Sequence, residues 1–206
     1  HLLNEGKEMK KIHFVGNTMI DSLVSFSKKI DESAIIKNLM INEKYALLTF
    51  HRPSNVDAIK PLMELVLSIE EISKNISLVF PIHPRTQKNL IKFNLLNRLR
   101  KIKNLSITSS LGYLDFMKLV KNASLVITDS GGIQEETTFL QIPCLTIREN
   151  TERPITITEG TNQLLPLNHI EIINSLRNLL TNSYESSIPL NWDGNASKRI
   201  LQILSK

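Results

Sequence analysis

A serine followed by two glycines stands at the centre of the residues that could bind a ligand. Ser130, Gly131 and Gly132 come directly after the apolar run 125–128 and just before an expected helix over 133–140. Glycines let the backbone bend tightly and approach a ligand, and the free N–H groups of a helix start attract anions. The stretch therefore predicts an anion site that fits a phosphate, although the same three residues also suit an ordinary strand-to-helix turn.

Charged side chains follow this turn at spacings that suit a nucleotide. Glu135 and Glu136 are expected in the first turn of the helix, where the helix dipole favours negative charge. Glu136 comes one turn after the glycines, within reach of a ribose whose phosphate lies on the turn. Arg153 belongs to the proline-stiffened loop 151–154, and its guanidinium can fork onto a diphosphate. Together these residues suggest a nucleoside diphosphate.

Short apolar runs alternate with helical patterns along the chain, which predicts an α/β fold with a Rossmann-like parallel sheet of about six strands and helices on both faces. We expect strands over 12–15, 45–50, 77–82, 105–108, 125–128, 144–147 and 163–165. We expect helices over 20–26, with Thr18 as a candidate cap, and over 56–74, 87–98, 118–121, 133–140, 169–180 and 195–204. Ligands of such sheets bind at the carboxyl edge of the strands.

Two histidines stand at expected strand ends on this edge. His51 and Arg52 follow the strand over 45–50, and His83 follows the strand over 77–82. A lone histidine is more often structural, but His51 is next to an arginine and a proline-stiffened loop at the ligand edge, which favours function for the pair. For His83 both interpretations stay open.

Composition sets outer limits on the function. The 206 residues, 41% hydrophobic and 22% charged, suffice for one globular domain and a tail. The formal charge of +5 permits an anionic partner, but the basic run 98–103 lacks interleaved aromatic residues, so we expect no nucleic-acid surface. Cys144 is the one cysteine, so it forms no internal disulfide and is expected to be buried. No apolar run reaches the ~20 residues of a membrane span, and cytoplasm is the expected location.

Several motifs together resemble the UDP-N-acetylglucosamine 2-epimerase family. The most specific are DSGGIQEE at 129–136, R-x-x-TERP at 148–154 and Gly-Thr-Asn at 160–162. Further matches are VGNT at 15–18 with Asp21, TFHR at 49–52 with NVD at 55–57, PIHP at 81–84 and GYLDF at 112–116. Family members commonly have glutamate where this chain has Ser54. The resemblance covers nearly the whole chain but only the carboxyl-terminal half of such an enzyme, and the chain begins at His1, so we expect a fragment.

The resemblance implies one half of a glycosyltransferase-B-type two-domain fold. Residues 1–11 would then be a linker from a missing amino-terminal domain, and residues 12–182 the Rossmann-like nucleotide-binding domain. Residues 183–206 would be a tail whose carboxyl-terminal helix packs on the missing domain. The amino-terminal domain and a second copy in a homodimer are the expected protein partners.

The resemblance also implies roles at a UDP site. Ser130, Gly131, Gly132 and Arg153 would hold the diphosphate, Glu136 the ribose and Phe116 the uracil. His51 is the expected catalytic residue of this half, and Arg52 and His83 are further candidates. As an alternative, Tyr113 and Phe116, at i and i+3, simply face the core.

The implied reaction interconverts UDP-N-acetylglucosamine and UDP-N-acetylmannosamine. The proton at sugar C2 is removed, UDP leaves by elimination, and it adds again after reprotonation on the other face. No metal, nicotinamide or other cofactor is expected. Three alternatives stay open: a hydrolysing 2-epimerase, a glycosyltransferase of the same fold, and a non-enzymatic α/β module in which Asp129 is only a helix cap.

Overall fold

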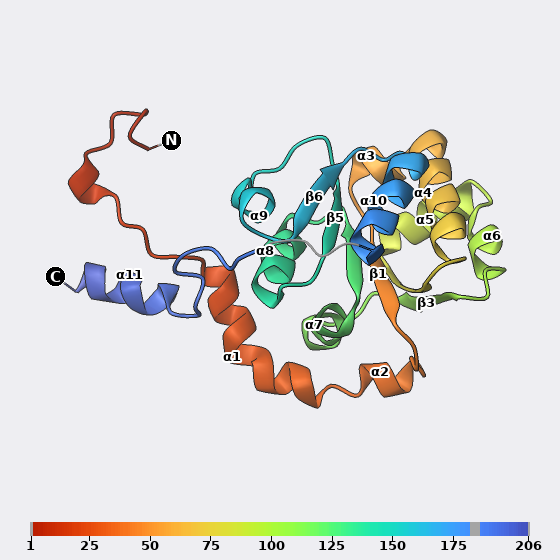
Figure 1. Ribbon diagram of the computed structural model, residues 1–206, viewed down its shortest axis with the longest axis horizontal. Helices are drawn as coiled ribbons and strands as arrows, with labels where there is room; N and C mark the ends of the chain where they lie inside the picture. Colours follow the sequence, from red (N-terminus) through yellow and green to blue (C-terminus); the bar gives the residue numbers. More distant parts are fainter. Residues whose placement is uncertain (1, 182–185, 206) are drawn as a thin grey trace.

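The computed structural model describes residues 2–181 and 186–205, which form a six-stranded parallel sheet between two layers of helices (Figure 1). The strands are β1 (Tyr45–Thr49), β2 (Ser77–Ile82), β3 (Leu105–Ser109), β4 (Leu125–Thr128), β5 (Cys144–Ile147) and β6 (Asn162–Leu165). The helices are η1 (Met9–Lys11), α1 (Thr18–Glu32), α2 (Ile35–Asn38), α3 (Pro53–Val56), α4 (Ile59–Ile72), α5 (Pro84–Lys92), α6 (Leu96–Arg100), α7 (Tyr113–Asn122), α8 (Gly131–Leu140), α9 (Ile155–Thr158), α10 (His169–Thr181) and α11 (Ala196–Leu204).

The strand order creates a switch point in the middle of the sheet. The strands lie in the order β3-β2-β1-β4-β5-β6, and each neighbouring pair is parallel. The chain therefore winds outward from β1 to β3 and then returns to start β4 on the other side of β1. At such a point the connections leave in opposite directions and open a crevice at the carboxyl ends of the strands. Thr49 of β1 pairs with Thr128 of β4, so the residues after them flank this crevice.

Two hydrophobic clusters hold the helical layers on the sheet. Along β1, Ala46 and Leu48 belong to one cluster, with α4, α6 and α10, while Tyr45 and Leu47 belong to the other, with α1, α2, α7 and α8. The alternation arises because successive strand side chains point to opposite faces. Both faces are covered, which explains why the strands are continuous apolar runs. The predicted fold class is confirmed.

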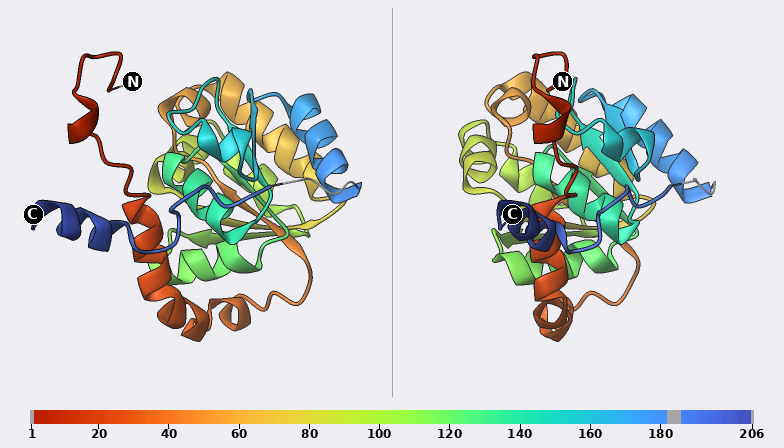
Figure 2. Two further views of the ribbon diagram at one scale, coloured as in Figure 1. Left: turned by 60° about the vertical axis from the view of Figure 1, so that its left-hand side comes forward. Right: turned by 90° about the vertical axis from the view of Figure 1, so that its left-hand side faces the viewer.

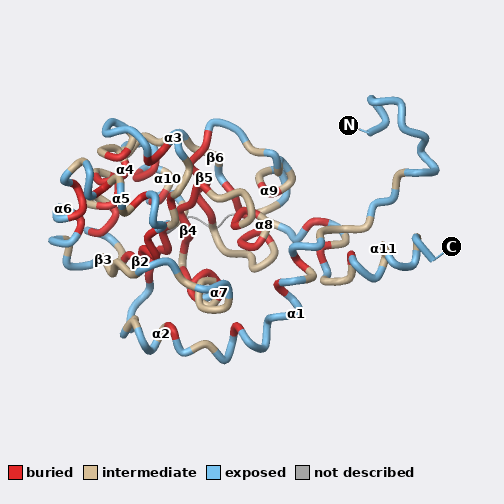
Figure 3. The backbone as a smooth tube through the Cα atoms, turned by 180° about the vertical axis from the view of Figure 1, so that it is seen from behind, coloured by how far each residue is buried: buried red, intermediate tan, exposed pale blue. Residues whose placement is uncertain are grey.

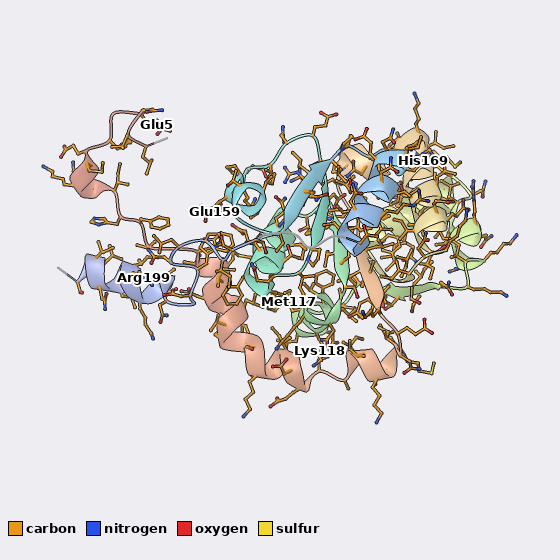
Figure 4. All side chains as sticks on the ribbon, in the orientation of Figure 1. Glu5, Met117, Lys118, Glu159, His169 and Arg199 are labelled. Atoms are coloured by element: carbon orange, nitrogen blue, oxygen red, sulfur yellow. The ribbon has the colours of Figure 1, made fainter. Side chains whose placement is uncertain are left out.

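Residues 2–17 and α11 lie together at one end of the molecule, away from the sheet (Figures 1 and 2). Figure 3 shows residues 2–11 as an exposed trace. Figure 4 labels Glu5 and Arg199 at this end, Arg199 on α11. The Arg199 guanidinium donates to the Val15 carbonyl at 3.1 Å and pairs with Asp193, so α11 and its preceding turn are tied to the segment before α1.

The strand predicted over 12–15 is wrong. The residues pair with no strand among those the structure describes, and Phe14 is 63% exposed. Their carbonyls are bound from elsewhere, because Asn191 donates to Phe14 O at 3.4 Å and Arg199 to Val15 O. The other six predicted strands are confirmed to within one residue, and Cys144 is buried as expected.

Several predicted helices differ at their boundaries. The helix over 56–74 is divided into α3 and α4 because Ala58 is extended, with φ −113° and ψ 153°. The helix over 87–98 is divided into α5 and α6 by Asn94, whose φ of 58° is left-handed, a conformation that asparagine tolerates well.

Two other helices begin earlier than predicted. The predicted helix over 118–121 is the end of α7, which begins at Tyr113. Helix α8 begins at Gly131, so Glu135 and Glu136 lie beyond its first turn and the predicted dipole stabilisation does not apply to them.

Two further expectations concern the domain boundary and membrane spans. The predicted boundary between domain and tail, at residues 182 and 183, lies outside the described residues. Within the part that is described, no helix is long and apolar enough to cross a membrane.

Candidate anion site at the switch point

The buried carboxylate of Asp129 joins the ends of β1 and β4. It accepts from the His51 N–H at 3.0 Å, the Arg52 N–H at 2.9 Å and the Asn55 side-chain amide at 3.2 Å, and it lies 3.0 Å from His51 Nδ1. Asn55 also donates to Ile147 O at 3.1 Å, which connects the same cluster to β5. An ionised carboxylate only accepts, so Nδ1 carries the hydrogen and Nε2 of a neutral His51 keeps its lone pair. Asp129 therefore fixes the position of His51 and its tautomer.

The turn after Asp129 leaves the start of α8 open. Ser130 N donates to Thr128 Oγ1 at 2.9 Å, but the Ser130 side chain caps none of the N–H groups of α8 among the described residues. A Cβ at Gly132 would meet Met19 Cε only at 3.9 Å. The first N–H groups of a helix without a cap are donors for an anion.

Arg153 lies directly against this turn. A Cβ at Gly131 would come 2.8 Å from Arg153 Nη1, so only glycine lets the guanidinium approach the backbone so closely. The guanidinium lies between two carboxylates, with Nε 3.2 Å from Glu135 Oε2 and Nη1 3.6 Å from Glu152 Oε2. The Arg153 N–H donates to Thr151 Oγ1 at 3.0 Å, which shapes the loop itself.

A second arginine lies behind the first. Arg148, at the end of β5, is 7% exposed, and its Nη2 donates to Glu152 Oε1 at 2.7 Å. Its Nη1 has no acceptor among the described residues and would lie 3.7 Å from a Cβ at Gly131. The Arg148 hydrogen bond lowers the pKa of Glu152 to about 2. Two guanidinium groups thus converge on one glycine, which makes this corner favourable for an anion.

Glu136 is buried inside the domain, 3% exposed. Burial raises its pKa to about 7; the Tyr113 hydroxyl, which binds the carboxylate, lowers this pKa, and the charge of Glu135 raises it.

Tyr113 is not in the core as the helical spacing predicted, because it is 40% exposed and packs edge-on against Phe26. Phe116 is half-buried against the hydrophobic cluster of α1, α7 and α8, which agrees with the core alternative for this residue.

His83 lies beside His51, with ring centroids 5.5 Å apart. Its Nδ1 accepts from the Arg85 N–H at 3.1 Å, so Nε2 carries the hydrogen. Arg85 also forms a two-bond ion pair with Asp57, which ties the start of α5 to the residues after α3. The structure therefore brings His51, Arg52 and His83 to the same edge as the glycine turn.

One surface cavity lies at this edge of the sheet, and a larger groove lies elsewhere. Arg52, Asn55 and Arg148 line a cavity of about 400 Å³ next to the strand ends. A larger groove of about 550 Å³ lies between α4 and α10, away from the turn, and we place the candidate site at the strand ends because the switch point and the guanidinium groups are there. Within the described part of the chain, no group of three or more His, Cys, Asp or Glu side chains could hold a metal ion.

Sequence reasoning missed the residues that support the site from behind. Asp129 and Asn55 organise the β1 end, and Asn17 donates to Glu135 Oε1 at 3.0 Å. A carboxylate directly before the Ser-Gly-Gly turn is a signal for such a role, but its partners follow from the β1–β4 adjacency, which the sequence does not specify. The Tyr113 contact likewise depends on how α7 packs beside α8.

The strand order and the turn at the switch point define a Rossmann-like α/β domain. The sequence profile of the UDP-N-acetylglucosamine 2-epimerase family matches residues 1–205, and the chain belongs to this family. A curated UDP-N-acetylglucosamine 2-epimerase from Methanococcus maripaludis is 42% identical over 210 residues, which are 99% of this chain and 57% of that protein.

Two further relatives are matched over a similar share of their length. The crystal structure of the Methanocaldococcus jannaschii UDP-GlcNAc 2-epimerase in complex with UDP-GlcNAc and UDP superposes with a TM-score of 0.89 at 39% identity, over 99% of this chain and 57% of that one. The UDP-2,3-diacetamido-2,3-dideoxy-D-glucuronate 2-epimerase of Pseudomonas aeruginosa is 34% identical over the whole chain and 56% of that protein. The chain thus spans a little over half the length of these relatives.

Proposed function

We propose that this chain is the UDP-binding half of a non-hydrolysing UDP-N-acetylglucosamine 2-epimerase. The observation that carries the proposal is the uncapped Ser-Gly-Gly turn at the switch point, with Arg153 Nη1 2.8 Å from the Cβ position of Gly131. A diphosphate supplies the acceptors that the N–H groups and the guanidinium need. The complex of the M. jannaschii relative with UDP-GlcNAc and UDP supports this ligand class.

The proposed nucleotide contacts follow the same edge of the sheet. Ser130 and the amides of Gly131 and Gly132 bind the diphosphate together with Arg153, and Glu136 accepts from the ribose hydroxyls. Phe116, which is half-buried, contacts the uracil. Arg148 adds positive charge from behind the turn, where low solvent exposure strengthens its field.

His51 is the proposed catalytic residue of this half. Epimerisation by elimination places negative charge on the departing UDP, and donors aimed at that charge lower the barrier. Asp129 orients the imidazole through Nδ1, so Nε2 donates to the departing diphosphate only when the ring is the doubly protonated imidazolium. Arg52, whose Nε donates to Asp129 O at 2.9 Å, and His83 are further proposed ligand contacts.

The proton transfers at sugar C2 are assigned to another part of the enzyme. They need groups on opposite faces of the sugar, within hydrogen-bond reach of C2. The carboxylates near the turn are already engaged: Asp129 with His51, Glu135 with Arg153, and Glu152 with Arg148.

We propose that an amino-terminal domain supplies the acid and base, that residues 1–11 lead from it, and that α11 packs on it. The homodimer and the cytoplasmic location stay predictions.

Two other activities remain as candidates. A hydrolysing epimerase would release UDP and free N-acetylmannosamine, and a glycosyltransferase would need an acceptor. The P. aeruginosa relative is named for a different UDP-sugar, so the names of the relatives share UDP but differ in the sugar. Identity of 42% and 39% to two UDP-GlcNAc 2-epimerases favours UDP-GlcNAc.

NMR in deuterated solvent tests this division of roles. With the 206-residue chain and UDP-GlcNAc, saturation transfer should reach the uracil and ribose protons, while the C2 proton should not exchange above a no-protein control. Absence of saturation transfer at millimolar ligand would contradict the UDP site. Deuterium at C2 would instead show that the catalytic base lies in this chain.

A further inference from the structure

Four residues form a chain of contacts from the start of α1 to the glycine turn. Asn17 Nδ2 donates to Glu135 Oε1 at 3.0 Å, and Glu135 Oε2 lies 3.2 Å from Arg153 Nε. Arg153 Nη1 in turn lies against Gly131. Asn17 is 118 residues from Glu135 in sequence, so the contact ties the segment before α1 to the proposed phosphate site.

Asn17 uses both ends of its amide in this arrangement. Its Oδ1 accepts from the Met19 N–H at 2.9 Å and caps α1, while Nδ2 donates to Glu135. Aspartate is also a good helix cap but has no donor for Glu135, and serine, another good cap, has only a shorter side chain with a hydroxyl in place of the amide N–H. Capping alone therefore does not require asparagine here.

Glu135 is placed to direct Arg153. Its side chain is 13% exposed, and its two oxygens face Asn17 and Arg153. A carboxylate at Nε leaves the outer edge of the guanidinium, including Nη1, turned toward Gly131. The other partner of Arg153, Glu152, is 61% exposed and farther away, at 3.6 Å, so it orients the side chain less firmly.

We propose that Asn17 and Glu135 are positioning residues that set the direction of the Arg153 guanidinium and so couple the amino-terminal end of α1 to diphosphate affinity. The inference rests on the proposed function, because it assumes that Arg153 binds the diphosphate. It adds that a displacement of the segment before α1 changes nucleotide affinity through the Asn17 amide and the Glu135 carboxylate.

The test is a double-mutant cycle on UDP affinity, measured by calorimetry with the 206-residue chain. Asn17→Asp keeps the cap and places a like charge beside Glu135, and we expect UDP to bind roughly tenfold more weakly, within the usual range for coupled neighbours. Asn17→Ser keeps the cap without that repulsion and should cost roughly threefold. Glu135→Gln keeps an acceptor for Asn17 but removes the charge that attracts Arg153, and it should fall between these variants.

In an Arg153→Ala background the same substitutions should change UDP affinity by less than about twofold. Uridine, which has no phosphate, should bind the parent and Asn17→Asp equally, as measured by NMR titration. Additive losses in the cycle, or equal losses for uridine and UDP, would overturn the positioning role. If the parent chain bound no UDP, the proposed function itself would fail, which is a separate outcome. Far-ultraviolet circular dichroism checks that each variant keeps its helices.

Discussion

The two sides of the glycine turn are held by different kinds of interaction. On the β1 side, Asp129 is fully buried and accepts from backbone and side-chain donors of His51, Arg52 and Asn55. On the β5 side, Glu152 and Arg153 are 61% and 33% exposed, and the loop that carries them is held by their ion pairs with Arg148, with Glu135 and with each other. Buried hydrogen-bonded charge is costly to disrupt, whereas exposed pairs are weak and screened by salt. The comparison suggests that His51 is placed by the folded core, and that the arginine loop can adjust to a ligand.

The largest expected effect is on the buried side. Asp129→Ala should lower the free energy of unfolding by about 3–5 kcal/mol, the cost of breaking a buried charged network. Urea denaturation followed by circular dichroism measures this. Asp57→Ala is the matched control, because Asp57 is also a paired aspartate but forms its ion pair with Arg85 on the surface. A loss for Asp129→Ala no larger than for the control would refute the contrast between the two sides.

The next effect concerns ligand affinity. Glu136→Ala should weaken UDP binding by about 1–3 kcal/mol, the range for a charged hydrogen-bond partner. Glu171→Ala, an exposed glutamate on α10, should leave affinity unchanged. Calorimetry of both variants gives the answer, and undiminished binding by Glu136→Ala would remove Glu136 from the ribose site.

The raised pKa of Glu136, about 7, predicts a pH dependence of affinity. Ribose hydroxyls donate to the ionised carboxylate, so binding is strongest above pH 7 and weakens as pH falls and the free protein takes up a proton. The dissociation constant for UDP should rise roughly tenfold from pH 8 to pH 6. Glu136→Gln is the control, because UDP itself titrates in the same way with this variant, which lacks the carboxylate. If the affinity of Glu136→Gln depended on pH as steeply as that of the parent, the prediction would be contradicted.

The smallest effect is expected on the exposed side. Glu152→Gln removes the charge that faces Arg148 and Arg153, but its carboxylate is 61% exposed. We expect the midpoint of thermal unfolding to change little and UDP affinity to change by roughly threefold or less. If Glu152→Gln lowered the free energy of unfolding as much as Asp129→Ala, the loop would be stabilised as strongly as the β1 side.

The sequence predicted most of the sheet because buried parallel strands are apolar throughout. The segment 12–15 is also mostly apolar but failed as a strand, since its carbonyls accept from Asn191, in the turn before α11, and from Arg199, on α11. Such distant partners leave no periodic pattern. The glycine turn and Arg153 were recognisable from residue type and spacing. The support given by Asp129 and Asn17 was not, because it depends on which strands and helices become neighbours.

Calorimetry of the 206-residue chain with UDP and GDP tests the central claim most directly, because the two ligands share the diphosphate and ribose and differ in the base. We predict that UDP binds, weakly for a single domain, and that GDP binds at least tenfold more weakly because Phe116 and its surroundings accommodate uracil. Equal affinity for the two would contradict the uracil assignment. No heat and no competition with either nucleotide would contradict the nucleotide site as a whole.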